Sequence, residues 1–176
     1  DPKVQLGIVS QFEKSPKFTM LDTMNFWMDN TLENLLKIIS KVDLICINDE
    51  EVIQLSGCKD YKNGIRKILN MGPKYLIMKK GEFGATLYSE SLEFFCSSFK
   101  VNKVIDPTGA GDSFAGAFAG YLAESKNYTF NSISNALIYG NAVASFCVEK
   151  FGIENMLHIS KDEIDKRISF IKKHNT

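Results

Sequence analysis

The sequence predicts an α/β protein built on a mostly parallel sheet. Within the first 80 residues, short apolar runs alternate with segments whose apolar residues recur every three or four positions. This alternation is typical of strands joined by helical crossovers, which form a parallel sheet with helices on its faces. A polar cluster also follows each of the three apolar runs, and parallel sheets bind ligands at the carboxyl ends of their strands. The 176 residues are enough for one domain, so we expect residues 1–176 to form a single one.

The first half of the chain supplies the three strands and the helices between them. Asp1-Pro2 predicts a helix from residue 2 to Phe12, because Asp favours the N-cap and Pro the first helical position. Gly57 and Gly72-Pro73 end later helices. The further expected elements are strands at 17–21, 42–47 and 75–79 and helices at 31–40, 50–55 and 62–71.

The second half predicts a hairpin followed by three helices. The hairpin pairs 84–88 with 92–96, and a helix starts at Gly109 with Thr108 as its expected N-cap. This helix runs to Glu124. The remaining expected helices cover 131–148 and 161–172.

The composition bounds the partners and the cellular location. Lys+Arg and Asp+Glu both number 21, so the chain has no net charge to attract nucleic acid or an anionic membrane. No apolar stretch approaches the roughly 20 residues of a membrane span, and the N-terminus lacks the features of a signal peptide. The four cysteines lie far apart, which favours free thiols in a reducing compartment. We expect a cytoplasmic protein without nucleic-acid or membrane partners.

The most informative stretch is DPTGAGDSFAG, at 106–116. It is not a dinucleotide-binding fingerprint, because the sixth position from Gly109 is Phe114, and it is not a Walker A loop, because no Gly-Lys-Ser/Thr follows. Small residues from Gly109 to Gly111 leave the first amides of a helix open to an anion. Close packing of the helix start is the alternative, but packing does not explain Asp112. A carboxylate there is suited to orient and deprotonate a hydroxyl that attacks a phosphate.

Asn48 and Glu51 lie three residues apart where a strand gives way to a helix. Glu51 is suited to hold water molecules bound to Mg²⁺, which keeps several waters and takes few protein ligands. Asn48 is suited to donate to a phosphate. The alternative is an ordinary helix N-cap with acidic residues in the first turn, and the same spacing fits it equally well.

Other polar residues stand where a nucleotide would bind, each with a plainer alternative. Lys79 is suited to neutralise phosphate charge, and Gly81 and Gly84 let the backbone approach a ligand, although most such turns are solvated loops. Asn25 follows the first strand and is suited to reach a phosphate. Asn141 lies among small residues on a helix, where it suits either a flat ligand or a helix–helix contact.

These motifs together resemble the PfkB (ribokinase-like) family of carbohydrate and nucleoside kinases. Residues 106–116 resemble the second signature of the family. Asn48-x-x-Glu51, Lys80-Gly81-x-x-Gly84 and Asn141-Ala142-Val143-Ala144 are similar to three further family motifs and occur in the family's order. The resemblance implies a ribokinase-like three-layer α/β/α sandwich.

The resemblance also implies an ATP-dependent kinase that acts on a hydroxymethyl group of a sugar or nucleoside. It assigns Asp112 as the catalytic base and Gly109, Ala110 and Gly111 as the anion hole. The residues it assigns to ATP are Asn25, Asn48, Lys79, Gly81, Gly84 and Asn141. Glu51 would hold Mg²⁺ through water, and Asp106 and Thr108 are candidates for a monovalent cation, K⁺.

The resemblance covers only the C-terminal, ATP-binding half of the family. The opening strands and the lid that hold the acceptor have no counterpart here, so we expect either a homodimer or a missing N-terminal half. Lys79 stands where several relatives carry a threonine, so its phosphate contact is not implied in detail. The alternatives to a kinase are a non-catalytic nucleotide-binding module and an inactive fragment.

Overall fold

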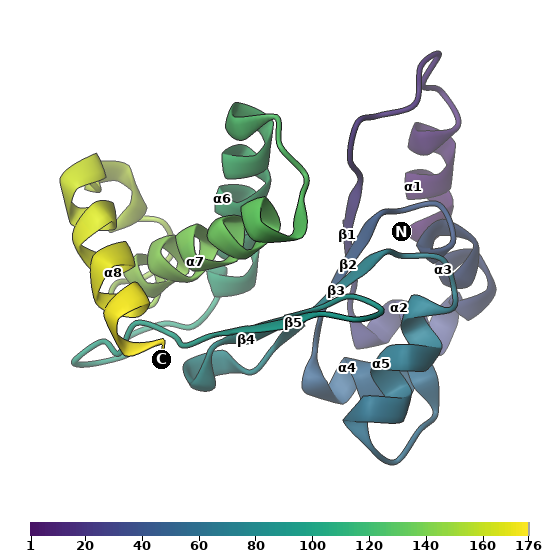
Figure 1. The fold of residues 1–176 in the computed structure, drawn as a ribbon, viewed down its shortest axis with the longest axis horizontal. Coiled ribbons are helices and arrows are strands. Elements are labelled where there is room, and N and C mark those ends of the chain that lie inside the picture. Colours follow the sequence, from purple (N-terminus) through teal and green to yellow (C-terminus); the bar gives the residue numbers. More distant parts are fainter. Residues whose placement is uncertain (176) are drawn as a thin grey trace. The chain divides into compact units, whose positions relative to one another are not determined.

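The computed structural model describes residues 1–175 and divides into two compact units, which are treated separately. The N-terminal unit comprises 1–79 with 87–93, and the C-terminal unit comprises 80–86 and the chain from Phe94 onward. The expected α/β fold is confirmed, with five strands forming one sheet in the order β1-β2-β3-β4-β5 (Figure 1). Strands β1, β2 and β3 are parallel.

The N-terminal unit alternates helices with three parallel strands. Asp1 caps the first helix as expected, with its Oδ1 accepting from the amide of Lys3 at 2.6 Å. The elements in chain order are α1 (Pro2–Val9), β1 (Met20–Asp22), α2 (Asn25–Asn30), α3 (Leu32–Ile39), β2 (Leu44–Asn48), α4 (Asp49–Ser56), α5 (Tyr61–Leu69) and β3 (Tyr75–Lys79).

Apolar side chains of the strands and helices form the core of this unit. Strand β2 is buried along its length except at Asn48. Ile45 and Ile47 pack with Leu76 and Met78 of β3 in one cluster. Helices α3 and α5 add apolar residues to the same cluster, among them Leu35, Ile38, Ile39, Ile65 and Ile68. Strands buried in this way are typical of parallel sheets covered by helices.

The C-terminal unit is mainly helical. The hairpin of β4 (Ala85–Tyr88) and β5 (Glu93–Cys96) contributes residues to both units, as the division of the chain shows. The other elements are η1 (Gly81–Phe83), α6 (Ala110–Ser125), α7 (Phe130–Cys147), η2 (Met156–His158) and α8 (Lys161–His174). The chain from α6 to α8 is drawn from green to yellow in Figure 1.

Helices α6 and α7 pack closely because a glycine faces an aromatic ring between them. Gly140 of α7 has no side chain where Phe114 of α6 lies, and a Cβ there would come within 2.9 Å of the ring. Phe114 in turn stacks on Phe118 with ring centroids 5.9 Å apart. One turn beyond, Tyr121 packs on Tyr139 at 5.5 Å.

Arg167 attaches α8 to α7. Its guanidinium donates to Ser145 Oγ at 2.7 Å and to a carboxylate oxygen of Glu149 at 2.6 Å. The same group lies over the rings of Phe99 and Phe146, 4.5 and 3.4 Å from their centroids. Hydrogen bonds, an ion pair and cation–π contacts therefore hold the last helix in place.

Two expected elements at the start of the chain are shorter than their patterns indicated. The first helix ends at Val9 rather than Phe12, because Ser10 Oγ and Gln11 Nε2 both donate to the carbonyl of Gly7 and compete with helical bonding. The strand expected at 17–21 covers Met20–Asp22 instead. Before it, Thr19 donates from its amide and hydroxyl to Asp43 Oδ2 at 3.0 and 2.9 Å.

One helix was not predicted, and one predicted cap is wrong. Asn25 follows β1 as expected, but it also begins the short helix α2, which has no capping side chain to mark its start. Thr108 is not the N-cap of α6. Gly109 holds that position with φ = +80°, a left-handed conformation that glycine adopts readily.

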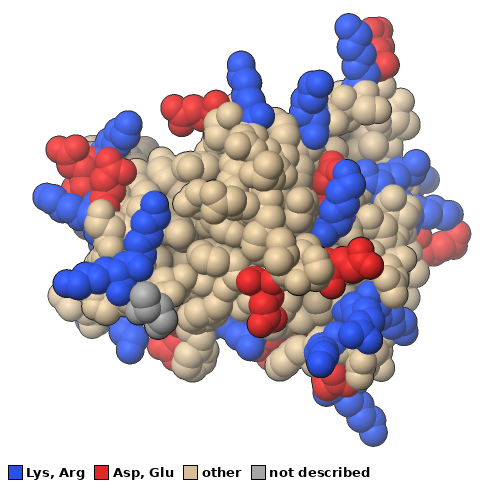
Figure 2. Space-filling model, viewed as in Figure 1, with Lys and Arg blue, Asp and Glu red and all other residues tan. Residues whose placement is uncertain are grey.

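Charged side chains of both signs are interspersed on the face shown in Figure 2. Among residues 1–175, no helix combines the length and apolar character needed to cross a membrane. All four cysteines in this part of the chain are free, and three of them, Cys46, Cys96 and Cys147, are buried.

Two glycine-to-alanine substitutions test the packing of α6 on α7. Gly140→Ala should lower the free energy of unfolding by about 1–3 kcal/mol, because its Cβ would overlap Phe114. Gly120→Ala on α6 is the matched control, since a Cβ there meets nothing within 4 Å. It should raise stability by about 0.5–1 kcal/mol through helix propensity. Urea unfolding measures both, and equal effects of the two changes would contradict the close contact.

Candidate functional site

A charged cluster lies at the carboxyl ends of the three parallel strands. Lys79, the last residue of β3, places its Nζ 3.1 and 3.3 Å from the two carboxylate oxygens of Asp22 at the end of β1. Between these strands, β2 ends at Asn48, which is the register partner of Lys79. We call Asp22, Cys46, Asn48, Glu51 and Lys79 the strand-end cluster. The structure therefore brings together three of the expected site residues, Asn48, Glu51 and Lys79, and adds Asp22.

Asn48 and Glu51 form a reciprocal capping box at the start of α4. Asn48 Oδ1 accepts from the amide of Glu51, and Glu51 Oε2 accepts from the amide of Asn48, both at 2.8 Å. The capping role weighed in the sequence analysis is thus present. It uses one oxygen of each side chain. The side-chain nitrogen of Asn48, Nδ2, and the second carboxylate oxygen of Glu51, Oε1, make no hydrogen bond to any group in residues 1–175. Both atoms are therefore available to a ligand.

Burial and mutual charge shift the pKa values in this cluster. Glu51 is only 4% exposed, and this burial raises its pKa although the Asn48 amide and Lys79 oppose the change. Burial alone would lower the pKa of Lys79, but the neighbouring Cys46, Asp22 and Glu51 outweigh it and raise that pKa. Burial also raises the pKa of the Cys46 thiol to about 12. The cluster therefore holds a protonated thiol and a charged ammonium at neutral pH.

The residues of the cluster fit the sparse protein coordination that Mg²⁺ prefers. No group of three or more His, Cys, Asp or Glu side chains in residues 1–175 is arranged to enclose a metal. Mg²⁺ does not require such a cage, because it is usually bound by one or two carboxylates, several waters and substrate phosphates. Glu51 Oε1 supplies one suitable acceptor.

Two further polar residues, Thr23 and Asn25, follow the end of β1. Asn25 is exposed in the first turn of α2 and makes no side-chain hydrogen bond within the described residues. Thr23, which sequence reasoning missed, follows Asp22 and has a buried Oγ1 without a hydrogen-bond partner in the same part of the chain. Nothing in the local sequence marks this threonine.

In the C-terminal unit, the first turn of α6 leaves three amides available. The amide of Ala110 donates to the carbonyl of Pro107 at 3.2 Å. The amides of Gly109, Gly111 and Asp112 donate to no group in residues 1–175. Asp112 is exposed in the same turn. Unpartnered amides and an exposed carboxylate thus lie together at the start of α6.

The residues before α6 form a tight turn. Asp106 Oδ1 accepts from the amide of Thr108 at 2.9 Å, and this bond lowers the pKa of Asp106. The thiol of Cys147 donates to the carbonyl of Thr108 at 3.5 Å. Asp106 is therefore a charged carboxylate within the turn where a monovalent cation was expected.

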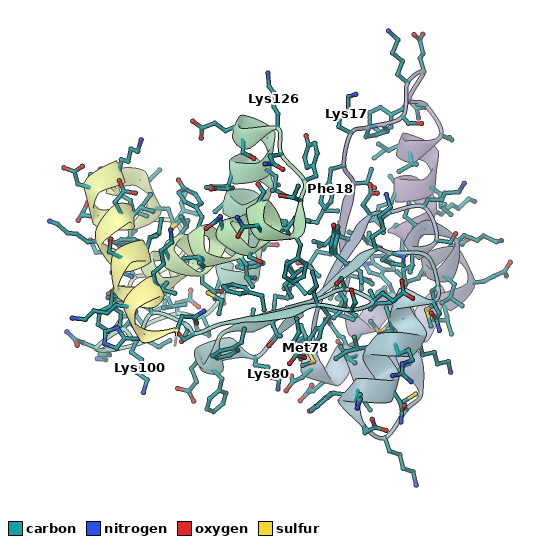
Figure 3. The ribbon with its side chains drawn as sticks, viewed as in Figure 1. Lys17, Phe18, Met78, Lys80, Lys100 and Lys126 are labelled. Atoms are coloured by element: carbon teal, nitrogen blue, oxygen red, sulfur yellow. The ribbon has the colours of Figure 1, made fainter. Side chains whose placement is uncertain are left out.

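Glycines shape the turn that follows β3. Gly81 and Gly84 have φ values of +54° and +102°, and the amide of Lys80 donates to the Gly84 carbonyl at 2.8 Å. A Cβ on Gly84 would lie 2.1 Å from the carbonyl oxygen of Cys96. Gly84 is therefore needed for close backbone approach to the end of β5. Figure 3 shows Lys80 directly before this turn and Lys100 in the segment after β5.

A cavity of about 560 Å³ lies within the C-terminal unit. Its lining includes Gly81 and, at the start of α6, Ala110, and one face of α7 supplies Asn141, Ala144, Ser145 and Val148 at helical spacing. Apolar residues complete much of the wall: Phe83, Phe99, Val101, Val104 and Pro107. The volume falls within the usual range of small-molecule sites.

Asn141 is fixed against the end of β5. Its Nδ2 donates to the carbonyls of Cys96 and Ser97 at 3.3 and 3.4 Å and contacts the Cys96 sulfur at 3.2 Å. Burial raises the pKa of that thiol to about 11. The residue expected to contact a nucleotide therefore also anchors the helix to the strand.

Gly84→Ala and Gly81→Ala test the backbone approach at this turn. Gly84→Ala should cost about 3 kcal/mol of unfolding free energy, since it combines a positive φ with a backbone clash. Gly81→Ala, which meets nothing within 4 Å, should cost only about 1–2 kcal/mol. Denaturant unfolding compares them. A Gly84→Ala protein as stable as Gly81→Ala would show that this approach is not needed.

Glu51→Gln tests the buried carboxylate, because glutamine retains the capping oxygen and removes the charge. Burial raises the pKa of Glu51 in the folded state, so wild-type stability falls as pH rises from the ordinary carboxyl range through that raised value. The free energy of unfolding of the variant minus that of wild type should therefore be larger at pH 7.5 than at pH 4. Thermal unfolding at both pH values measures this, with exposed Glu50→Gln as the control for loss of one charge. A difference independent of pH would contradict burial of the charge.

Comparison with known proteins identifies relatives among sugar and nucleoside kinases. The chain is 37% identical over 89 residues to cytidine kinase of Thermococcus kodakarensis, a match that covers 49% of this chain and 32% of that enzyme. The structure of Methanocaldococcus jannaschii nucleoside kinase, an archaeal member of the ribokinase family, matches with a TM-score of 0.77 and 27% identity. That match covers 97% of this chain and 54% of the nucleoside kinase.

A third matched structure contains bound ligands. A putative ribokinase II from E. coli in complex with ATP and Mg²⁺ matches with a TM-score of 0.68 and 28% identity, over 87% of this chain and 48% of that one. The chain thus spans about half or less of the length of these relatives. The fold is ribokinase-like. A family model described as pfkB family carbohydrate kinase matches residues 11–159, and the chain belongs to that family.

Proposed function

We propose that this chain is the nucleotide-binding and catalytic part of a kinase that transfers the γ-phosphoryl group of MgATP to a hydroxymethyl group of a sugar or nucleoside. The observation that carries the proposal is the first turn of α6. There, unpartnered amides stand beside the exposed Asp112, and Ala110 of the same turn lines the cavity. Family membership and a relative bound to ATP and Mg²⁺ support the choice of cofactors.

Asp112 is the proposed base. Its carboxylate accepts the proton of the acceptor hydroxyl while the hydroxyl oxygen forms a bond to the γ-phosphorus. The bond from that phosphorus to the bridging oxygen breaks, and ADP leaves with the electron pair. We assign the turn from Gly109 to Gly111 to the charge that develops on the transferring group, since free helical amides stabilise anions.

The proposed role of the strand-end cluster is to bind the phosphates of MgATP. Asn48 and Lys79 donate hydrogen bonds to phosphate oxygens, and Glu51 Oε1 holds water in the shell of Mg²⁺. When bound, the metal neutralises phosphate charge. We also assign Asn25, Gly81, Gly84 and Asn141 to ATP, and Asp106 with Thr108 to a monovalent cation, K⁺. Glu51 contributes a fixed acceptor because the Asn48 amide holds its other oxygen.

Activity of the intact protein with MgATP and a panel of sugars and nucleosides tests the reaction. Asp112→Asn should lower kcat by about 10²–10⁴-fold while leaving the affinity for MgATP nearly unchanged. Asp162→Asn is the matched control, because it removes a first-turn carboxylate from a different helix, α8. Near wild-type turnover by Asp112→Asn would show that Asp112 is not the base.

Calorimetric titration with MgATP separates the kinase from the two alternatives. Binding together with turnover of an acceptor in the panel is the result we expect. Binding without turnover of any acceptor would favour a non-catalytic nucleotide-binding module. No heat and no thermal shift with MgATP would contradict the proposal and favour an inactive fragment.

A further inference from the structure

We infer that Cys147 is a positioning residue for the proposed anion hole, because its thiol holds the peptide between Thr108 and Gly109 in the orientation that presents the Gly109 amide to an anion. The inference rests on the proposed function, in that the turn before α6 receives charge from the transferring phosphoryl group. It assigns a role to a buried cysteine that the proposed reaction does not use.

Residues 107–110 form a β-turn at the start of α6. The amide of Ala110 donates to the carbonyl of Pro107 at 3.2 Å, and Gly109 has φ = +80° and ψ = −1°. These angles match the third residue of a type II turn. A type I turn differs by a flip of the central peptide, which here joins Thr108 to Gly109. Because glycine adopts the backbone angles of both types, the residues of the turn leave this peptide free to flip.

The central peptide is held differently from the peptides on either side of it. On one side, the amide of Thr108 donates to Asp106 Oδ1 at 2.9 Å, and on the other the carbonyl of Gly109 accepts from the amide of Ser113 at 2.8 Å. The carbonyl of the central peptide belongs to Thr108. Within residues 1–175 it accepts only from the thiol of Cys147, at 3.5 Å. The orientation of this peptide therefore depends on a side chain.

The position of the thiol determines where the Gly109 amide points. Cys147 is the last residue of α7 and is buried, and a Cβ on Gly109 would lie 3.7 Å from its sulfur. The peptide is trans, so its carbonyl and its N–H point in opposite directions. With the Thr108 carbonyl turned toward the thiol, the Gly109 N–H points away from Cys147. A flip would exchange the two and replace a donor for the anion with a carbonyl oxygen.

The strength of the contact suits a choice between two turn types. A thiol is a weak donor, and the same sulfur also lies 3.9 Å from the carbonyl oxygen of Gly152. One net hydrogen bond shifts an equilibrium by about 3- to 10-fold, which is enough to favour one of two otherwise similar turns. The Thr108 oxygen keeps a second lone pair, so the contact is compatible with the proposed monovalent cation.

Cys147→Ala in the intact protein removes the donor and gives the first test. With KCl held constant, kcat should fall about 3- to 10-fold while KM for MgATP stays nearly unchanged, because an anion hole acts on the transferring group. Cys147→Ser keeps a donor and should recover most of kcat. Ser134→Ala should leave kcat unchanged. It is the matched control, since it removes a buried donor from the same helix, one that bonds to the carbonyl of Phe130.

Two results of this comparison would overturn the inference and leave the proposed function standing. One is wild-type kcat in Cys147→Ala. The other is a Cys147→Ser protein as slow as Cys147→Ala, which would assign the effect to lost volume rather than to the lost donor.

The turn type itself gives a second test that needs no turnover. In NMR spectra, the nuclear Overhauser effect between Thr108 Hα and the Gly109 N–H is strong in a type II turn and weak in a type I turn, because the flip separates these protons. It should weaken in Cys147→Ala and keep its wild-type strength in Ser134→Ala. An unchanged effect in Cys147→Ala would overturn the inference. Absence of turnover in the wild type would instead overturn the proposed function, and this measurement would then decide whether Cys147 orients the peptide.

A double substitution separates positioning from general stabilisation. Gly109→Ala disfavours positive φ and should shift the turn toward type I by itself. Adding Cys147→Ala should then change kcat little, because both substitutions act on the same flip. Effects on log kcat that add in full would contradict the inference.

Discussion

The register of the three parallel strands determines where the charged groups of the N-terminal unit lie. Pairing of β2 with β3 sets Asn48 beside Lys79, and pairing of β1 with β2 sets Asp22 beside Cys46. Side chains alternate along a strand, so a slip of one residue would turn each of them to the other face. Buried Ile45 and Leu76, also register partners, resist such a slip. The same apolar contacts that stabilise the unit therefore hold the strand-end cluster together.

Stability alone does not account for this cluster. Removing Glu51 from water is costly, and the partly exposed ion pair of Lys79 with Asp22 contributes little to stability by itself. The cluster is tolerated because each charge has partners: Lys79 pairs with Asp22, and Glu51 accepts from the Asn48 amide. Groups with pKa values shifted by burial and by each other are typical of functional sites. The arrangement therefore supports the proposal that a ligand uses the remaining Asn48 and Glu51 atoms.

The features that the sequence predicted well are those that depend on neighbouring residues. Asp1-Pro2 at a helix start, Asn48 with Glu51, and Gly57 as a left-handed C-cap each act within a few positions. The helix α2 was missed because it is six residues long and no side chain caps it. The strand-end ion pair joins residues 57 apart, and no local pattern reveals it.

The cavity of the C-terminal unit illustrates the same division between local and tertiary information. The motif around Asn141 indicated a role at a ligand, but which of its two amide atoms is available depends on β5, 45 residues away. Likewise, the small residues at the start of α6 were visible in the sequence. The hydrogen bond from the Ala110 amide to the Pro107 carbonyl was not visible in the sequence, because it depends on the conformation of the turn.

The way α6 begins shows why a glycine cap suits the proposed reaction. Helices α4, α5, α7 and α8 begin with side chains that accept from their first-turn amides: Asn48, Asp60, Thr129 and Ser160. Such a cap typically contributes about 1 kcal/mol to stability. Helix α6 lacks this contribution because its N-cap is Gly109. A serine or aspartate at that position would occupy the amide of Gly111 or Asp112. Because glycine has no side chain to compete, the amides that satisfy a cap elsewhere in the protein stay available here for an anion.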